Sequence, residues 1–136
     1  MEPAFSVKGD RTMELAPYFK SVLDQDPDDI VICGLDHEIL YMNPAALSDY
    51  QKYGGAALLG RSVLDCHNPK SREHICQVLD WFARDPGHNS VFTYHSTRKN
   101  MDVYMVALRD EGGTLIGYYE KHAPRAPETG TPFSMD

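Results

Sequence analysis

The chain has 136 residues, 42% of them hydrophobic, with 8 Tyr, 5 Phe and a single Trp. This length supports one domain with its own hydrophobic core and is too short for two ordinary domains. Lys and Arg number 13 against 20 Asp and Glu, which gives a net charge of −7. Because nucleic-acid affinity comes largely from clustered Lys and Arg, this balance argues against DNA or RNA as a direct partner.

The sequence carries no membrane or secretion pattern and no metal-binding motif. No apolar run approaches the roughly 20 residues that span a bilayer, and the N-terminus lacks the charged-then-apolar order of a secretory signal. We therefore expect a cytoplasmic protein that does not engage a membrane. Cys33, Cys66 and Cys76 form no CxxC pair, and the six His form no HxxxH or HExxH pair. Neither a disulfide framework nor a preformed metal site is indicated.

One domain is predicted over residues 13–122, between two flexible ends. Residues 1–12 and 123–136 hold Pro, Gly and charge without periodicity, which is typical of loose termini. The domain begins with an amphipathic helix from Met13 to Leu23, where apolar residues recur at helical spacing. The run Asp24-Gln25-Asp26-Pro27 ends that helix.

The middle of the chain predicts a hairpin followed by helices. Residues 29–35 and 39–43 are apolar, β-branched runs joined by a polar turn. Asn43-Pro44 and Asn68-Pro69 then each place an N-cap before a proline at the first helical position. The second of these starts the longest helix, which residues 85–87 end. Its apolar stripe has i, i+3, i+4, i+7 spacing and comprises Ile75, Val78, Leu79 and Phe82.

Three strands complete the predicted domain, over residues 90–96, 102–108 and 114–120. The connectors at residues 97–100 and 110–113 both have the composition of hairpin turns. The expected fold is α+β, with a five-stranded antiparallel sheet and helices packed on one face, which buries all the apolar stripes together.

Several segments, taken in order over residues 19–122, resemble the PAS superfamily. The hairpin from Asp29 to Asn43 is similar to its "apolar strand, Asp, turn, Ile, apolar, Asn" pattern, and residues 43–46 to its Asn-x-Ala-Ala helix start. Leu58-Leu-Gly-Arg-Ser-Val-Leu64 is similar to its Ile-Gly-Arg step, and residues 109–117 to its last hairpin. Asp65-Cys-His-Asn-Pro-Lys-Ser71 further resembles a Cys-His-x-Pro-Lys-Ser step of certain bacterial PAS domains. The resemblance implies a PAS fold and a sensory role.

Two photosensory chemistries of the family are argued against by single residues. The reactive thiol of flavin-binding light sensors corresponds to Val63 here, and Cys66 lies three residues later. Flavin photochemistry is therefore disfavoured. The Tyr and Glu that bind the chromophore in photoactive yellow protein correspond to Met42 and Ala46, which argues against a covalent chromophore.

The cofactor is not identified by the sequence, and haem is one possibility that the resemblance keeps open. Oxygen-sensing PAS kinases ligate haem iron through a His near the start of the long helix, and Ser71 to Leu79 is similar to that step with a shift of one residue. His74 is the predicted metal ligand if haem binds. On a helical wheel it lies at the edge of the apolar stripe, which also fits a boundary His that only contacts water.

Other candidate binding residues cluster before the long helix and on the inner sheet face. Cys66 and His67 could coordinate a metal or present a redox thiolate at a helix N-terminus, although a buried thiol and a loop His fit equally. Lys70 and Ser71 at that N-terminus could seat a carboxylate or phosphate, or serve only to cap the helix. Tyrosines on the inner face, represented by Tyr94 and Tyr104, are further candidates for a pocket wall.

The sequence favours a sensory domain over an enzyme. No nucleophile with a base and no carboxylate pair around a cleft is visible, and Asp28-Asp29 and Asp110-Glu111 fall in turns, where charge usually indicates solvated surface. The leading hypothesis is a domain that binds a small molecule and signals through protein contacts. The alternative is a ligand-free interaction module.

The expected partner is a second copy or a separate signalling protein. Candidate residues for the outer sheet face alternate along one of two strands, depending on register. These residues are Val91, Thr93 and His95 on one strand, or Val103, Met105 and Ala107 on the other.

Overall fold

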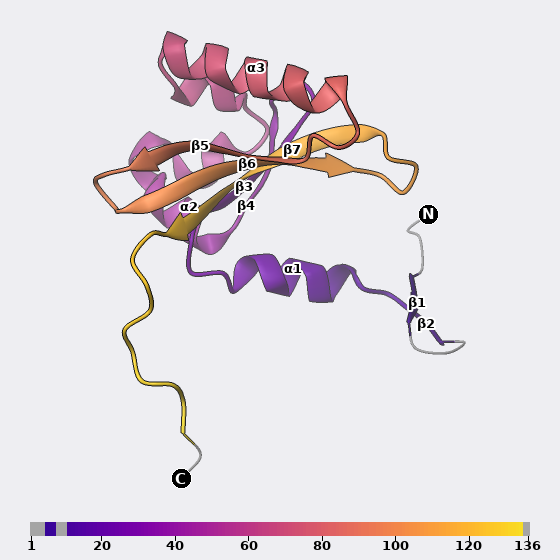
Figure 1. The fold of residues 1–136 in the computed structure, drawn as a ribbon, viewed down its shortest axis with the longest axis vertical. Coiled ribbons are helices and arrows are strands. Elements are labelled where there is room, and N and C mark those ends of the chain that lie inside the picture. Colours follow the sequence, from indigo (N-terminus) through magenta and orange to yellow (C-terminus); the bar gives the residue numbers. More distant parts are fainter. Residues whose placement is uncertain (1–4, 8–10, 135–136) are drawn as a thin grey trace.

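The computed structural model describes residues 5–7 and 11–134, with the elements shown in Figure 1. The strands are β1 (Phe5–Val7), β2 (Arg11–Met13), β3 (Ile30–Gly34), β4 (Ile39–Met42), β5 (Ser90–Ser96), β6 (Met101–Arg109) and β7 (Leu115–Pro124). The α-helices are α1 (Ala16–Asp24), α2 (Pro44–Asp49) and α3 (Pro69–Arg84). Three single-turn 3₁₀ helices lie between α2 and α3: η1 (Gln51–Tyr53), η2 (Gly55–Leu58) and η3 (Val63–Cys66). The predicted order of elements from the first hairpin onward is confirmed.

Five strands form one antiparallel sheet in the order β4-β3-β7-β6-β5, which confirms the predicted α+β fold. β7 is the central strand, and Glu120 pairs with Val31 on β3 and with Met105 on β6. Cross-strand partners share a face of the sheet. Glu120 is therefore placed at the centre of the inner face, among core residues.

The helices α2 and α3 cover that inner face. From the predicted α3 stripe, Ile75, Val78 and Phe82 are buried against the sheet, and Leu79 packs beside them. The helix ends at Arg84, immediately before the Asp85-Pro86-Gly87 break that the sequence contains. Figure 1 shows α3 on one side of the sheet and α1 on the other.

Both predicted N-caps are confirmed, but they differ in burial. Asn68 is exposed and its side chain accepts only from the backbone N–H of Ser71. Asn43 is fully buried, and its Oδ1 accepts from Ala46 N and from Ile30 N, both at 3.0 Å. Its Nδ2 donates to carbonyl oxygens of the loop before β3. Asn43 thus joins α2 to the start of the sheet.

The register corrects the expected outer face. Val103 and Met105 are buried, and Val91 and Ala107 pack against the core. Val103, Met105 and Ala107 point inward because they pair with the inner residues of β7, and Val91 pairs with Met105. The irregularity between Phe92 and Tyr94 changes the phase of β5 around Thr93, so His95 pairs with Asp102 on the outer face, as expected. The outer face instead carries the residues between them, such as Phe92, which is 49% exposed.

The first helix starts later than predicted and leaves its apolar face uncovered. The expected helix began at Met13, but Arg11–Met13 is a strand and α1 begins at Ala16, with a proline in its first turn. Within α1 no residue is buried, and Tyr18 and Val22 are 59% and 70% exposed. The C-terminal end is held by Tyr41, whose hydroxyl donates to Asp24.

The two ends differ in part from the expectation of flexible termini. Strands β1 and β2 pair in a two-stranded sheet where no strand was predicted, while residues 1–4 and 8–10 of the expected N-terminal segment lie outside the described residues. β7 continues to Pro124, past the predicted end of the domain at 122. Beyond it, residues 125–134 form neither helix nor strand, and residues 135–136 lie outside the described part.

Among the described residues, no helix has the length and apolar character needed to cross a membrane.

Candidate functional site

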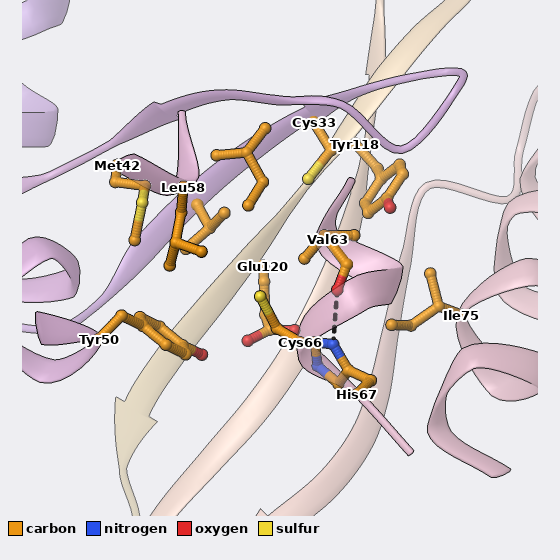
Figure 2. A pocket seen from close by; sticks show the side chains of 12 residues that line it. Cys33, Met42, Tyr50, Leu58, Val63, Cys66, His67, Ile75, Tyr118 and Glu120 are labelled. Atoms are coloured by element: carbon orange, nitrogen blue, oxygen red, sulfur yellow. Dashed lines mark hydrogen bonds between the residues drawn. The ribbon is translucent and has the colours of Figure 1, made fainter. Parts of the chain in front are cut away.

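The inner sheet face and the segment from Tyr50 to His67 enclose a cavity of about 20 Å³. Figure 2 shows the side chains around it. By the usual volume criterion it holds about one water-sized group. The lining residues are Val31, Cys33, Ile39, Met42, Tyr50, Leu58, Val63, Cys66, His67, Ile75, Tyr118 and Glu120.

The alternation of strand side chains brings polar groups to this cavity from the centre of the sheet. Tyr118 and Glu120 are two residues apart on β7 and both face the helices. Cys33 is paired with Tyr118 across β3 and β7. A phenol, a carboxylate and a thiol therefore line one wall, and the opposite wall comes from the 3₁₀ helices.

Glu120 forms an ion pair within its own strand. Its Oε1 lies 3.1 Å from Nε2 of His122, and both side chains are largely buried, at 16% and 10% exposure. Burial alone would lower the pKa of His122, but the hydrogen bond to Glu120 and the charges of Glu120 and Asp29 outweigh it and raise that pKa. The imidazolium form is thus favoured next to the cavity.

A hydrogen-bonded chain runs from the cavity wall toward α3. Cys33 lies opposite Tyr118 on the neighbouring strand, and the Tyr118 hydroxyl lies 2.7 Å from Nδ1 of His37. Nε2 of His37 contacts Sγ of Cys76 at 3.9 Å. Burial raises the pKa of Cys33 to about 12 and lowers that of His37, so both groups are neutral at physiological pH. The sequence pattern indicated no role for Cys76 or His37, which meet only because the β3–β4 turn folds against α3.

An acidic cleft lies beside the cavity, at the end of β7. Asp29 and Asp49 are hydrogen-bonded to each other, Lys99 forms an ion pair with Asp49, and His122 lines the same cleft. Asp29 is only 6% exposed, and burial together with Asp49 raises its pKa to about 7. The prediction of solvated surface charge at Asp28-Asp29 is therefore wrong for Asp29.

Of the predicted site residues, the structure places Cys66 and His67 in the cavity wall. Nδ1 of His67 lies 2.8 Å from the carbonyl oxygen of Val63 (Figure 2), so Nδ1 carries a hydrogen and donates it. In the neutral ring the other nitrogen, Nε2, is then an acceptor. Burial raises the pKa of Cys66, which opposes a reactive thiolate at this position.

The predicted haem and anion ligands lie outside the cavity. His74 is exposed on α3, in a shallow depression with Trp81 and Val91. Lys70 is exposed, and Ser71 takes part in the helix cap through its backbone N–H. Binding sites for cofactor-sized molecules have volumes of about 300–1,000 Å³, far above the 20 Å³ found here. The residues present do not fit haem in this conformation.

The two predicted pocket tyrosines lie on opposite faces of the sheet. Tyr94 pairs with the inward-facing Val103 but is 51% exposed at the sheet margin. Tyr104 lies between the buried residues of β6 and therefore on the outer face, where its ring contacts Phe92 at 5.5 Å between centroids. Neither residue lines the cavity, and the inward placement of Tyr104 is corrected by the register.

The sequence did not point to Glu120 and Tyr50, the polar groups that oppose each other across the cavity. Figure 2 shows the Glu120 carboxylate and the Tyr50 hydroxyl directed toward the same region. The sequence did contain one signal: Tyr118, Glu120 and His122 occupy the inward phase of the last strand. Charged residues on the core-facing phase of a central strand are uncommon unless they are paired.

Comparison with known families identifies the architecture. A family model described as "PAS fold" matches residues 23–121. This range covers β3 to β6, most of β7, the helices α2 and α3 and every cavity-lining residue. No curated protein matches the chain.

Solved structures show the same fold at low sequence identity. The PAS domain of a protein from Colwellia psychrerythraea aligns with a TM-score of 0.62 and 16% identity, over 82% of this chain and 97% of that one. A sensory box sensor histidine kinase from Vibrio cholerae aligns with a TM-score of 0.57 and 17% identity, over 78% and 88%. The Aer2 receptor from Vibrio cholerae, described as a dual PAS-heme oxygen sensor, aligns at 0.52 and 16%, over 73% and 95%.

Proposed function

The chain belongs to the PAS fold family, and on this premise we propose that it is a cytoplasmic sensory domain without catalytic activity. A small molecule occupies the cavity on the inner sheet face, and the resulting change is passed on through contacts with another protein. The observation that carries the proposal is the cavity itself, where one carboxylate, two phenols and an imidazole converge in an otherwise apolar wall.

The sheet provides a direct route from the cavity to the surface. Tyr118 and Glu120 line the cavity from β7, and β7 pairs with both β3 and β6. The side chains between them, such as Tyr119, belong to the outer face by alternation. A ligand that displaces Tyr118 or Glu120 therefore shifts the central strand and the surface that it presents.

Haem is not included in this proposal. The relative whose description names haem shares the fold at 16% identity. In this chain the predicted ligand His74 is exposed on α3, away from the cavity. The proposed ligand is a molecule of a few heavy atoms, admitted by a local shift of the 50–67 segment.

Exposed apolar residues favour a second function, a ligand-free interaction module. Tyr18 and Val22 on α1 and Phe92 and Ile116 on the sheet are between 49% and 70% exposed. Large apolar residues grouped on one surface are typical of protein interfaces. In this alternative a second copy or a separate signalling protein covers that surface, and the cavity stays empty.

Native mass spectrometry and the absorption spectrum of protein purified from cells separate the two functions. The sensory proposal expects an additional mass that is released on denaturation. Val63→Phe, which fills the cavity, should abolish this mass and leave the oligomeric state unchanged. If α1 forms a homodimer, Val22→Ser on α1 should abolish the dimer and leave the additional mass unchanged. A colourless wild-type protein of bare-chain mass whose unfolding no small molecule alters would contradict the sensory proposal.

A further inference from the structure

The cavity has a fixed charge of one sign. Its wall contains one carboxylate, Glu120, and neither Lys nor Arg. The negative charge of Glu120 contributes to the raised pKa values of Cys33, Tyr50 and Tyr118, behind the larger effect of burial. Three thiol and phenol groups therefore remain uncharged. Glu120 is the charged group that faces the cavity directly, whereas its ion-pair partner His122 does not line the cavity.

One oxygen of this carboxylate is available to a ligand. Oε1 of Glu120 accepts from His122, whereas Oε2 has no hydrogen-bond partner among residues 5–7 and 11–134. Nε2 of His67 is a second acceptor on the cavity wall, because Nδ1 of the same ring donates to the carbonyl oxygen of Val63. Two acceptors thus border a space of about 20 Å³, which fits one ammonium-sized group.

We propose that the ligand is a small primary alkylammonium ion, with its NH₃⁺ group on Glu120 Oε2 and His67 Nε2 and its alkyl chain against Met42, Leu58 and Ile75. This inference rests on the proposed sensory function and specifies its ligand class. An ammonium group supplies three donors and a positive charge. A charge-assisted hydrogen bond of this kind is roughly twice as strong as a neutral one.

An anionic ligand would be repelled by the carboxylate of Glu120. Like charges at hydrogen-bonding distance repel each other, and His122, which partly offsets the charge of Glu120, does not line the cavity. A carboxylate or phosphate in the cavity would face Glu120 at short range and find no Lys or Arg on the wall. The phenol and thiol donors of Tyr50 and Cys33 do not offset that repulsion, because they are neutral groups.

The alkyl chain requires the cavity to widen, and one wall is suited to this. Tyr50, Leu58, Val63, Cys66 and His67 all belong to the segment of single-turn helices between α2 and α3. Short 3₁₀ turns have poor hydrogen-bond geometry and open locally at lower cost than the sheet. Each added methylene that enters the widened cavity should tighten binding by about fourfold.

A matched ligand series on the full chain tests the inference. Alkylammonium chlorides from ethyl to hexyl and sodium alkanoates of the same carbon number are titrated separately into ¹⁵N-labelled protein at constant ionic strength. We expect the ammonium salts to shift the amide resonances around the cavity, with affinity that rises with chain length before levelling off. The alkanoates should give at least tenfold weaker binding at every length.

Two variants assign the effect to the cavity carboxylate. Glu120→Gln should weaken ammonium binding at least tenfold and reduce the preference over alkanoates. Glu111→Gln, which changes an exposed carboxylate in the β6–β7 turn, should leave both unchanged. If Glu120→Gln does not fold, the wild-type comparison between the two ligand series decides alone.

The outcomes distinguish the ligand class from the function. Equal binding of both series, or tighter binding of alkanoates, overturns the ammonium inference and leaves the sensory proposal intact. If a molecule of another chemical class co-purifies with the protein and neither series binds, the ammonium inference fails and the sensory proposal stands. If neither series binds and the purified protein has its bare-chain mass, the inference and the proposed function both fail.

Discussion

The carboxyl groups of Asp29 and Asp49 are hydrogen-bonded to each other, so one of them holds a proton. Asp29 is the protonated partner because it is buried, which raises its pKa to about 7, whereas the hydrogen bonds from Lys99 and Asp29 lower the pKa of Asp49. Asp28 and His122 also face this cleft. Near neutral pH, one shared proton therefore links Asp49 at the end of α2 to Asp29 just before β3.

This arrangement predicts a component of stability that falls as pH rises. From about pH 4, the usual carboxyl value, to about pH 7, the folded chain holds a proton at Asp29 that the unfolded chain releases. Asp29→Asn keeps an N–H donor for Asp49 but cannot ionise. We expect this substitution to make the protein more stable than wild type at pH 8 by on the order of 2 kcal/mol. Between pH 5 and pH 8 the variant should lose less stability than wild type does.

Urea unfolding at pH 5, 6, 7 and 8 measures this difference. Asp80→Asn is the control, since Asp80 is exposed on α3 and its replacement should leave the pH dependence of wild type unchanged. His122 adds a second decline above pH 6.5, because its raised pKa stabilises the folded state only while the ring is protonated. Identical pH slopes for wild type and Asp29→Asn would disprove the shared proton.

The order of helices and strands was predicted from the sequence because each element is determined by residues close together in the chain. Asn-Pro starts, the apolar stripe of α3 and the turn at residues 110–113 act over a few neighbours, and all three are confirmed. The five strands and the helical face follow from burying those stripes together.

The site was predicted only in part because it depends on register. Cys66 and His67 precede a recognisable helix start, and they do line the cavity. Asp29 was interpreted as surface charge and Glu120 drew no prediction, since nothing within a few residues shows that β7 is central or that α2 brings Asp49 to Asp29. The face of Tyr104 likewise depended on a pairing that changes every side chain if it slips by one residue.

Glu120→Gln is predicted to lower the pKa of His122. In the wild type the hydrogen bond and charge of Glu120 offset burial, which acts in the opposite direction. Without the carboxylate, burial should dominate and the pKa should fall below its wild-type value. Titration of the His122 Cε1–H signal by NMR gives the value directly.

A comparison with Asp29→Asn tests the cause of that shift. Asp29 acts on His122 only through its charge, whereas Glu120 acts through a hydrogen bond as well. The decrease in the pKa of His122 should therefore be smaller in Asp29→Asn than in Glu120→Gln. A wild-type pKa in the Glu120→Gln protein would contradict the ion pair.

Replacing the two N-caps should have unequal effects. Asn68→Ala removes one exposed cap and should cost about 1 kcal/mol. Asn43→Ala leaves the backbone N–H groups of Ile30 and Ala46 without their acceptor in a buried position, and we expect a loss of about 3–5 kcal/mol. Chemical denaturation of the two variants under the same conditions measures the difference, and similar losses would show that Asn43 acts only as a cap.

Replacement of Gly117, where β7 pairs with β3, is predicted to destabilise the fold. A Cβ atom at this position would lie far inside contact distance of the Cys33 carbonyl oxygen, which belongs to the sheet and cannot move aside. Gly117→Ala should therefore destabilise the fold by about 2–3 kcal/mol and disturb Cys33 at the cavity wall. Gly112→Ala is the matched control, because its Cβ would meet Asp110 Oδ1 at an ordinary 3.5 Å and should change stability by no more than about 0.5 kcal/mol. Thermal unfolding compares the two, and equal melting temperatures would refute the close approach of β7 to β3.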